Sequence, residues 1–384
     1  MKRKIVFLSG SRAEYGLMRN VIQLFKDDKD FNTLIAVTGS HLNKKFGNTV
    51  QEIINDGLKI DKELKIPLND SSHGVSLSIS KLILIFSEYL EKVKPDLLIV
   101  LGDRYEVFGA VVAAHIHNIK IAHIHGGELT EGAFDDAFRH SISKMSSIHF
   151  TACEEYRKRV IQLGEQPSSV HNVGLLGLDG ITKRSFLTKS EIEEDLKFKF
   201  LKQNFLVTFH PETKLSRKEN VACLEELLDS LSNFGDTRII FTGVNADKFN
   251  APFKKLINNF CSSNKNSLCF ESLGQLRYFS CLKQVDIVIG NSSSGILEVP
   301  WFRIPTINIG NRQKGRLQGQ SIINCKANSK VILSSIRRAL RDYNNINKYK
   351  KSPYRLQNTA NKIYKIIKRA EDLSSTKSFF DISF

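Results

Sequence analysis

Short apolar runs alternate with longer segments of helical periodicity along the whole chain. In the first half, the apolar runs predict strands at residues 5–8, 34–37, 97–101, 121–124, 148–151 and 173–176. Residues 76–93 carry apolar side chains at helical spacing and predict a helix between two of these strands. The run 97–101 is apolar throughout, as expected of a central strand in a parallel sheet covered on both faces. The pattern therefore predicts an α/β fold.

A second series of apolar runs follows a break in the pattern. Residues 177–190 are rich in Gly, Asp, Lys and Ser and predict a linker. The later strands are predicted at residues 205–209, 238–242, 268–270, 285–289 and 306–309. We therefore expect two Rossmann-like domains facing each other across a cleft, over residues 1–180 and 181–355, and then a C-terminal helix and tail over 356–384.

Length and composition agree with a two-domain globular protein. The 384 residues are too many for one ordinary core. The apolar runs are far shorter than the roughly 20 residues of a membrane span, and the first one ends at Ser9, too early for a signal peptide. The six cysteines form no CxxC pair or metal-ligand spacing. We expect reduced thiols in a cytoplasmic protein with no membrane partner.

The net charge of +16 raises the question of a nucleic-acid partner. Residues 301–384 hold 18 Lys or Arg and 4 Asp or Glu, a net of +14, so the first 300 residues are nearly balanced. No recognisable nucleic-acid module accompanies this basic segment. A solvated helical face explains the charge of the tail better, and no nucleic-acid partner is expected.

Residues 121–140 form the first candidate site. A buried strand there breaks at a Gly-Gly pair and is followed by a dense group of titratable or charged side chains. Ligands bind at strand-end loops of α/β proteins, so the group is a candidate for acid–base chemistry. The alternative is a solvated loop that leads into a helix with charged caps. The group comprises Glu128, Glu131, Asp135, Asp136, Arg139 and His140.

Small and hydroxyl residues mark a second candidate site at 290–298. Ser292 and Ser293 follow a predicted strand and precede a predicted helix, an arrangement that fits a diphosphate, although Ser-rich turns also serve only as N-caps. Glu298, one turn into that helix, either accepts bonds from ribose hydroxyls or is solvated. Arg312 can neutralise phosphate charge. His210 either contacts substrate or is a hydrogen-bonded core residue.

Other candidates lie at strand ends of the first half. Asp103 and Arg104 directly follow the apolar strand 97–101, and Arg12 lies in a polar turn that matches neither GxGxxG nor the GxxxxGK[ST] phosphate loop. His123 and His125 alternate on one strand and face the same way, so a two-histidine metal site is geometrically possible. No third ligand stands at a convincing spacing, and we expect neither a metal nor a cofactor.

Seven motifs occur in order: S-G-S-R-A-E-Y-G, L-G-D-R-Y-E, H-I-H-G-G-E, D-D-A-F-R-H-S-I-S-K, F-H-P-E-T, G-N-S-S-S-G-I-L-E-V-P and N-I-G-N-R-Q-K-G-R. Together they resemble the UDP-N-acetylglucosamine 2-epimerases, most closely the hydrolysing bacterial branch of sialic-acid biosynthesis, over residues 3 to about 320. The resemblance implies a GT-B-like pair of Rossmann-like domains, a last helix that crosses back to the first domain, and a homodimer or homotetramer.

The resemblance also implies a reaction. UDP-N-acetylglucosamine and water give UDP and N-acetylmannosamine, by elimination through 2-acetamidoglucal and then hydration, without a cofactor. The same chemistry on UDP-N,N'-diacetylbacillosamine, for legionaminic acid, is the first alternative. A non-hydrolysing epimerase, which retains UDP on its product, is the second. A glycosyltransferase of similar shape lacks an acceptor-site signature here.

Functional residues carry over onto matching positions. The catalytic positions are Asp103, Asp135, Asp136 and His210, and the substrate-binding positions are Arg12, Arg104, Ser292, Ser293, Glu298 and Arg312. Asn245, just after the predicted strand 238–242, is a further substrate-binding candidate.

One position departs from the family pattern. Many relatives have H-x-E where this chain has His123-Ile124-His125, and the glutamate is assigned acid–base work. Either His125 takes this role, or Glu128 or Glu131 replaces it.

Overall fold

The computed structural model describes residues 2–43, 49–68, 71–131, 134–183, 185–212, 214–243, 250–342, 352–354, 358–370 and 377–382. The chain forms two compact units, the first of residues 1–128, 135–179 and 354–384, the second of residues 129–134 and 180–353. The first predicted domain was continuous from 1 to 180, whereas residues 129–134 group with the second unit. A long-range contact accounts for this grouping: the Glu131 backbone N–H donates to the Lys314 carbonyl oxygen over 3.1 Å.

The first unit contains a seven-stranded parallel sheet in the order β3-β2-β1-β4-β5-β6-β7. The central strand β4, Leu97–Leu101, is buried at every position, as its apolar sequence predicted. The other strands are β1 Arg3–Ser9, β2 Phe31–Thr38, β3 Lys62–Leu64, β5 Lys120–Ile124, β6 Ile148–Thr151 and β7 Val170–Asn172.

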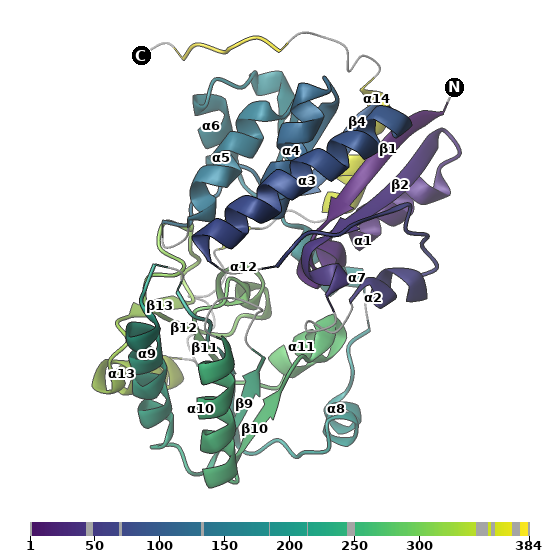
Figure 1. The fold of residues 1–384 in the computed structure, drawn as a ribbon. Coiled ribbons are helices and arrows are strands. Elements are labelled where there is room, and N and C mark those ends of the chain that lie inside the picture. The colour runs from purple at the N-terminus through teal and green to yellow at the C-terminus, as the bar shows by residue number, and fades with distance from the viewer. Residues whose placement is uncertain are drawn as a thin grey trace. The chain divides into compact units, whose positions relative to one another are not determined.

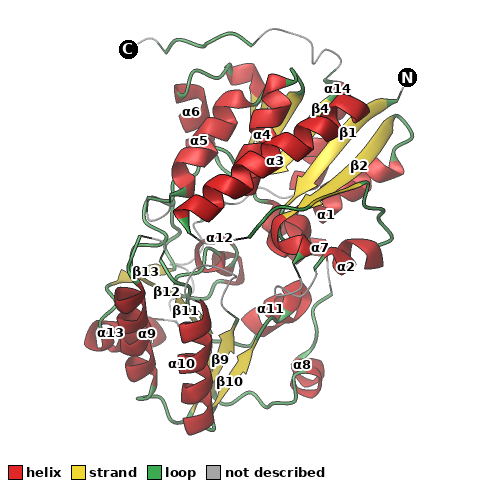
Figure 2. Cartoon of the chain, in the orientation of Figure 1, coloured by secondary structure: helices red, strands yellow, loops and turns green. Residues whose placement is uncertain are grey.

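Helices cover both faces of this sheet (Figures 1 and 2). Alternate residues of β1 point to opposite sides: Ile5 and Phe7 pack with α1 and α14, and Val6 and Leu8 pack with α3 and α4. The helices of this unit are α1 Arg12–Asp27, α2 Val50–Asn55, α3 Ser72–Val93, α4 Tyr105–Ile116, α5 Asp135–Met145, α6 Glu154–Gln162 and α14 Thr359–Arg369, with short 3₁₀ helices η1 Gly39–Leu42 and η3 Pro167–Ser169.

The second unit repeats this architecture around a six-stranded parallel sheet in the order β10-β9-β8-β11-β12-β13. Its strands are β8 Gln203–Thr208, β9 Thr237–Thr242, β10 Ser267–Phe270, β11 Ile287–Gly290, β12 Thr306–Ile309 and β13 Ile322–Cys325. Its helices are α8 Lys189–Asp195, α9 Arg217–Leu231, α10 Asn250–Ser263, α11 Gly274–Leu282, α12 Ser294–Leu297, η4 Val299–Phe302 and α13 Ser329–Asp342. The two sheets confirm the predicted pair of parallel α/β domains.

Each sheet has one point at which the strand order reverses. In the first sheet the chain builds β1 to β3 outward and then returns to place β4 beside β1; in the second it places β11 beside β8. Loops at the carboxyl ends of strands around such a switch point are the usual ligand sites of open α/β sheets. The loops concerned follow β1, β4, β8 and β11.

Several predicted elements need correction. Residues 173–176 were predicted as a strand, but β7 is Val170–Asn172, and helix α7, Leu176–Lys183, begins at the last residue of that predicted strand and runs into the predicted linker. A short run of apolar residues fits a strand or a buried helix turn equally well, which explains the shift. Strands β3 and β13 were not predicted either; both are short edge strands whose residues are exposed or half-buried except Leu64, and neither has a continuous apolar run.

The last helix, α14, packs on the first unit. Its buried residues Ile363 and Ile367 join the core beside α1. Asp179 accepts the backbone N–H groups of Thr359 and Ala360 over 2.8 and 2.6 Å, which satisfies two donors of the first turn. At the other end, Arg3 donates to the Ile367 carbonyl oxygen over 2.8 Å. Both ends of α14 are therefore bound to the first unit.

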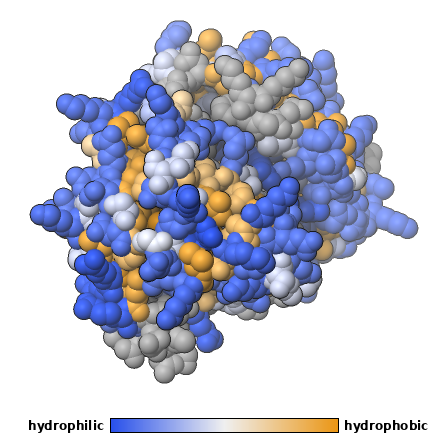
Figure 3. Space-filling view, turned by 90° about the horizontal axis from the view of Figure 1, so that it is seen from below, coloured by the Kyte–Doolittle hydropathy of each residue, from blue (hydrophilic) through white to orange (hydrophobic). Residues whose placement is uncertain are grey.

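No helix in the described part of the chain is long and apolar enough to cross a membrane. On the face drawn in Figure 3, apolar residues lie in a band flanked by hydrophilic side chains.

Candidate active site

Asp103 lies at the end of β4 against a buried arginine. Gly102, at φ 82°, turns the chain out of the strand just before it. The Arg139 guanidinium, 3% exposed, contacts the Asp103 carboxylate and donates to the Glu128 carbonyl oxygen over 2.9 Å. Arg139 thus joins the loop after β4 to the loop after β5, and a charge-assisted contact of this kind fixes the carboxylate in place.

His123 supports the loop that carries Asp103. Its Nε2 lies 2.8 Å from the Gly102 carbonyl oxygen, which can only accept, so this nitrogen carries the proton. Its Nδ1 lies 3.0 Å from the Ser143 hydroxyl. Burial lowers the pKa of His123 to about 3, so the ring is neutral. Both nitrogens are engaged, and His123 is a buried structural support for the loop that carries Asp103.

Asp135 and Asp136 begin α5 and have different surroundings. Burial, and then the nearby Asp103 carboxylate, raise the pKa of Asp135 to about 7, against the opposing effect of Arg104 and Arg139. Asp136 lies 3.7 Å from the Arg139 guanidinium and 3.7 Å from His140 Nε2. Asp103 and Asp135 therefore form a pair of carboxyl groups that resists holding two negative charges.

His125 and Glu128 are buried together, 8% and 2% exposed. His125 Nδ1 lies 3.3 Å from Glu128 Oε1, and no described residue hydrogen-bonds to His125 Nε2. His125 has φ 68°, and its backbone N–H donates to the Phe150 carbonyl oxygen over 2.8 Å. Glu131 lies elsewhere: its carboxylate is half exposed and pairs with Lys314 over 3.1 Å. His125 and Glu128 thus remain candidates for the missing glutamate, while Glu131 is held by the second unit.

The two arginines predicted in the first unit differ in setting. Arg104 Nη2 donates to Glu106 over 2.9 Å, and its Nε lies 3.5 Å from Glu14. Arg12 begins α1 and pairs with Glu52 of α2 over 2.6 Å, both about 40% exposed. Arg104 is therefore fixed by buried carboxylates, whereas Arg12 is held by a surface contact.

In the second unit, Asn291 connects three strand-end loops. Its side chain accepts from the His210 backbone N–H and donates to the His210 carbonyl oxygen, both over 2.7 Å. Its own carbonyl oxygen accepts from Arg312 over 3.3 Å and from Gln313 over 3.0 Å. The loops after β8, β11 and β12 are thereby held together, with Asn291 fully buried between them.

His210 is 4% exposed, and burial together with the Arg312 charge lowers its pKa well below the ordinary value. The ring is therefore neutral. Arg312 keeps its charge because a guanidinium does not lose its proton in proteins. The pair thus offers a neutral imidazole beside a fixed cation.

The Ser-rich loop after β11 leads into a helix of only one turn. Ser292 and Ser293 are partly exposed, and Ser293 is the N-cap of α12, Ser294–Leu297. The sequence analysis placed Glu298 inside a longer helix; it instead caps the end of α12, and Pro300 of the following 3₁₀ helix explains the early stop. Asn245, predicted to bind substrate, lies outside the described residues.

Comparison with known proteins now decides the family. Residues 23–368 match the family described as UDP-N-acetylglucosamine 2-epimerase. The chain belongs to this family. The resemblance seen in the sequence is thereby confirmed.

Relatives in this family differ in the sugar that they are named for. A Campylobacter jejuni protein named GDP/UDP-N,N'-diacetylbacillosamine 2-epimerase (hydrolyzing) is 42% identical over 329 residues, 85% of each chain. The Escherichia coli polysialic acid biosynthesis protein P7 is 41% identical over 87% of this chain and 85% of that protein. A Legionella pneumophila UDP-N,N'-diacetylbacillosamine 2-epimerase (hydrolyzing) is 32% identical over 88% and 89%.

A solved structure of the family shares the fold. The UDP-GlcNAc 2-epimerase of Neisseria meningitidis, bound to UDP-GlcNAc, aligns with a TM-score of 0.80 over 95% of this chain and 100% of that one, at 18% identity. A second one, from Listeria monocytogenes, aligns with a TM-score of 0.79 over 100% of both chains, at 16% identity.

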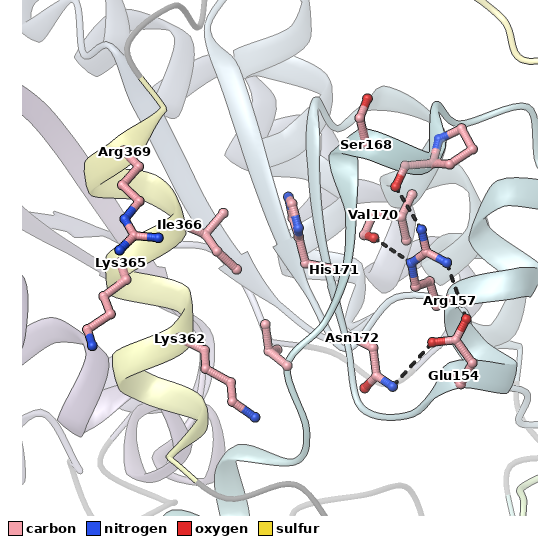
Figure 4. Close-up of a pocket in the computed structure, with 12 residues that line it drawn as sticks. Glu154, Arg157, Ser168, Val170, His171, Asn172, Lys362, Lys365, Ile366 and Arg369 are labelled. Atoms are coloured by element: carbon pink, nitrogen blue, oxygen red, sulfur yellow. Dashed lines mark hydrogen bonds and ion pairs between the residues drawn. The ribbon is translucent and has the colours of Figure 1, made fainter.

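A pocket of about 560 Å³ lies away from these loops, between α6, β7 and α14 of the first unit (Figure 4). None of the predicted site residues lines it. Its carboxylate, Glu154, is bound by Arg157 over 3.2 Å and by Asn172 over 3.4 Å. The Glu154 carboxylate is thus held by two neighbours, and the candidate acid–base residues lie at the strand ends instead.

The supporting roles of three residues were not predicted from the sequence, although Arg139 was named in the first candidate site and His123 as a possible metal ligand. Arg139, His123 and Asn291 act through partners 20 to 81 positions away, which no local pattern reveals. One signal was present for Asn291, because it is a polar residue directly after the glycine that ends a buried strand.

Proposed function

We propose that the protein is a hydrolysing UDP-sugar 2-epimerase that converts UDP-N-acetylglucosamine and water to UDP and N-acetylmannosamine. In the first step, a base takes the proton at sugar carbon 2 while the bond from carbon 1 to the diphosphate oxygen breaks. The C–H electron pair forms the double bond of 2-acetamidoglucal, and UDP leaves with the electrons of its bond. Water then adds its oxygen to carbon 1 and gives up one proton to a base of the site, while an acid delivers a proton to the opposite face of carbon 2.

The observation that carries this proposal is the Asp103–Asp135 pair at the first switch point. General acid–base catalysis is most effective when the pKa of the group lies near the working pH, and Asp135 has a pKa of about 7. Asp103, held by Arg139, places a second carboxyl group beside it. Two carboxyl groups in different surroundings can act as base and acid. We assign Asp103 as the base and Asp135 as the carboxyl group that first stores a proton. Asp136 orients Arg139.

His125 and Glu128 supply the second proton-transfer group in this proposal. The His125 ring is buried beside the Glu128 carboxylate, so a proton can pass between the two without crossing solvent. A glutamate stands at the His125 position in many relatives, and Glu128 then takes over the carboxylate function through the histidine.

The second unit is proposed to bind the nucleotide. Ser292 and Ser293 offer hydroxyl and backbone donors at the end of β11, and Arg312 stands nearby as the cation that supports the departing diphosphate. Neutral His210 can donate one N–H to a phosphate oxygen. Glu298 accepts from ribose hydroxyls, and Asn245, Arg12 and Arg104 complete the predicted contacts.

A second substrate is favoured by specific relatives. Two of the proteins that share 32% or more identity with this chain are named for diacetylbacillosamine and are described as hydrolysing. The same elimination and hydration apply to that sugar, because its carbons 1 and 2 carry the same groups as those of N-acetylglucosamine.

Product analysis tests the reaction and the substrate together. Purified protein is incubated with either UDP-sugar, and free UDP is measured by chromatography. UDP release from UDP-N-acetylglucosamine supports the first proposal, and faster release from the diacetamido sugar selects the second. Epimerised sugar still linked to UDP would identify a non-hydrolysing enzyme instead.

A homodimer or homotetramer in the cytoplasm completes the proposal, as the family resemblance implies. Light scattering coupled to size-exclusion chromatography measures the assembly; a monomer at micromolar concentration would contradict it.

A further inference from the structure

Three strand-end loops of the first unit meet around the Arg104 guanidinium. The backbone N–H and the hydroxyl of Ser40, after β2, donate to the Gly10 carbonyl oxygen, after β1, over 2.9 and 3.0 Å. The Gly10 N–H in turn donates to Glu14 Oε2 over 2.7 Å. Glu14 lies beside Arg104, which follows β4. The loops around the β1/β4 switch point are therefore one connected network.

Two buried carboxylates hold Arg104 from behind. Glu106, fully buried, accepts from Arg104 Nε over 3.2 Å and from Nη2 over 2.9 Å. Glu14, 5% exposed, places its Oε1 3.5 Å from Nε. The Arg104 side chain is 39% exposed, and Nη1 bonds to no described residue. This leaves the outer N–H groups of a rigidly held cation available to solvent.

The surroundings of the Glu106 carboxylate are tightly packed. A Cβ at Gly39, which has φ 59°, would lie 2.8 Å from Glu106 Oε1 and 2.7 Å from the Gly10 carbonyl oxygen. A side chain at this position would therefore push into Glu106 and the β1 loop. The tight packing indicates that the position of Glu106, and with it the direction of Arg104, is defined.

We propose that Glu106 is a positioning residue that fixes the Arg104 guanidinium as an anion-binding group for the nucleotide, and that Glu14 adjusts the net charge beside this guanidinium. The inference rests on the proposed function, since it takes UDP as the ligand. A guanidinium held by two of its nitrogens presents a fixed fork, and fixed donors lose less rotational freedom when they bind an anion. Neither glutamate contacts substrate in this arrangement.

Glu14 makes the net charge around the Arg104 guanidinium depend on pH. Burial, and then the opposing Arg104 and repelling Glu106 charges, bring its pKa to about 7. The groups that face it are the Gly10 N–H and Ser11 hydroxyl of its own loop, Arg104 and Glu106. Below this pH Glu14 is neutral and the Arg104 charge is balanced by Glu106 alone. Above it, a second negative charge weakens the attraction of Arg104 for a diphosphate.

The test measures UDP affinity by titration calorimetry, together with turnover of UDP-N-acetylglucosamine. We expect Glu106→Gln to weaken UDP binding roughly tenfold or more, because the glutamine NH₂ cannot accept from Arg104 and one of the two hydrogen bonds that fix the guanidinium is lost. Glu106→Asp should restore part of the affinity. Glu63→Gln on β3, a half-exposed surface residue, is the matched control and should bind UDP as the wild type does.

Glu14→Gln provides a second, gentler variant. It mimics the neutral acid, so its UDP affinity should equal that of the wild type at pH 6 and exceed it at pH 8. Titration of Asp135 and of UDP affects both proteins alike, so it cancels in the ratio of the Glu14→Gln affinity to the wild-type affinity. A ratio that does not change with pH would overturn the role of Glu14.

The outcomes separate this inference from the proposed reaction. Unchanged UDP affinity in folded Glu106→Gln, with active wild type, overturns the inference alone. Wild type that binds UDP through a Glu106-dependent site but turns over neither UDP-sugar contradicts the reaction and leaves the inference standing. If Glu106→Gln does not fold, the inference is decided by the ratio of the UDP affinity of Glu14→Gln to that of the wild type at pH 6 and at pH 8. Wild type that does not bind UDP overturns both.

Discussion

Asp103 and Asp135 are both carboxyl groups at the carboxyl end of the first sheet, yet their surroundings differ. Asp103 contacts the buried Arg139 guanidinium, whereas burial and the Asp103 charge raise the pKa of Asp135 to about 7. Neighbouring carboxyl groups in different surroundings suit a reaction in which one proton is removed and another returned. The proposed chemistry therefore needs the difference between the two residues as well as their proximity.

Replacement of Asp103 tests its role directly. Asp103→Asn keeps the shape and the contact with Arg139 but removes the base. We expect turnover to fall about 10²- to 10⁴-fold while UDP affinity stays within about threefold, since general base catalysis has this magnitude. Asp30→Asn, at an exposed position, is the control. Turnover within a factor of two of the wild type would remove Asp103 from the mechanism.

The raised pKa of Asp135 has a consequence for stability. The folded protein holds this proton more tightly than the unfolded chain, whose carboxyl has a pKa near 3.8. Stability from this group is fully present below pH 3.8 and is lost as pH rises through about 7. Asp135→Asn removes the effect. Its melting temperature relative to wild type should therefore rise by roughly 2–4 °C between pH 5 and pH 8.

Differential scanning fluorimetry at both pH values measures this difference. A constant offset between Asp135→Asn and wild type would show that the carboxyl titrates normally in the folded protein.

The sequence predicted many of the residues that cluster at the strand ends, but not the ones that fix them. Asp103 follows the fully apolar strand β4 and His210 follows the largely apolar strand β8, so both could be located at strand ends from the sequence. The positions of Glu106 and Asn291 in the networks depend on tertiary contacts, and each was seen only as a letter in a motif. Asn291 bonds to His210, which lies 81 residues earlier.

At the scale of elements, hydrophobic pattern was a good guide in the centre of each sheet and a poor one at the edges. Strand β4 is buried at all five positions and was predicted with its observed bounds. Edge strand β3 has only Leu64 buried, so it leaves no apolar run to detect. Helix α7 contains two glycines and an aspartate, which suggested a linker; tertiary packing overrides their low helix propensity.

Asp179 of α7 offers a test of how α14 is attached. Its two oxygens accept the first backbone N–H groups of α14 in a buried setting. Asp179→Ala leaves both donors unpaired and should lower the free energy of unfolding of the first unit by about 1–3 kcal/mol. Asp236→Ala, at an exposed turn, is the control. Equal chemical denaturation curves for the two variants would contradict the assigned cap.

At the scale of the whole molecule, the two sheets differ in their number of strands but share the same type of strand order. Each reverses its strand order once, and the candidate residues follow the two central strands at each reversal: Arg12 and Asp103 in the first unit, His210 and Ser292 in the second. The sequence predicted the repetition because the apolar runs restart after the linker. It could not predict that residues 129–134 group with the second unit, since the Lys314 contact responsible spans 183 residues.

The basic C-terminal segment also becomes clearer at this scale. Its helices α13 and α14 belong to different units, so its net charge of +14 is divided between the two units. On α14, Lys368 pairs with Asp28 over 2.5 Å, beside the buried apolar face. A solvated helical face therefore accounts for this part of the charge.

One measurement decides whether the protein performs the proposed elimination and hydration. The purified protein is incubated in deuterated water with UDP-N-acetylglucosamine, and in parallel with the diacetamido sugar, without added metal or nucleotide cofactor. NMR spectroscopy follows carbon 2. We predict free UDP and an inverted free sugar that carries deuterium at carbon 2. An inverted sugar with hydrogen retained at carbon 2, or no UDP release from either substrate, would contradict the proposed mechanism.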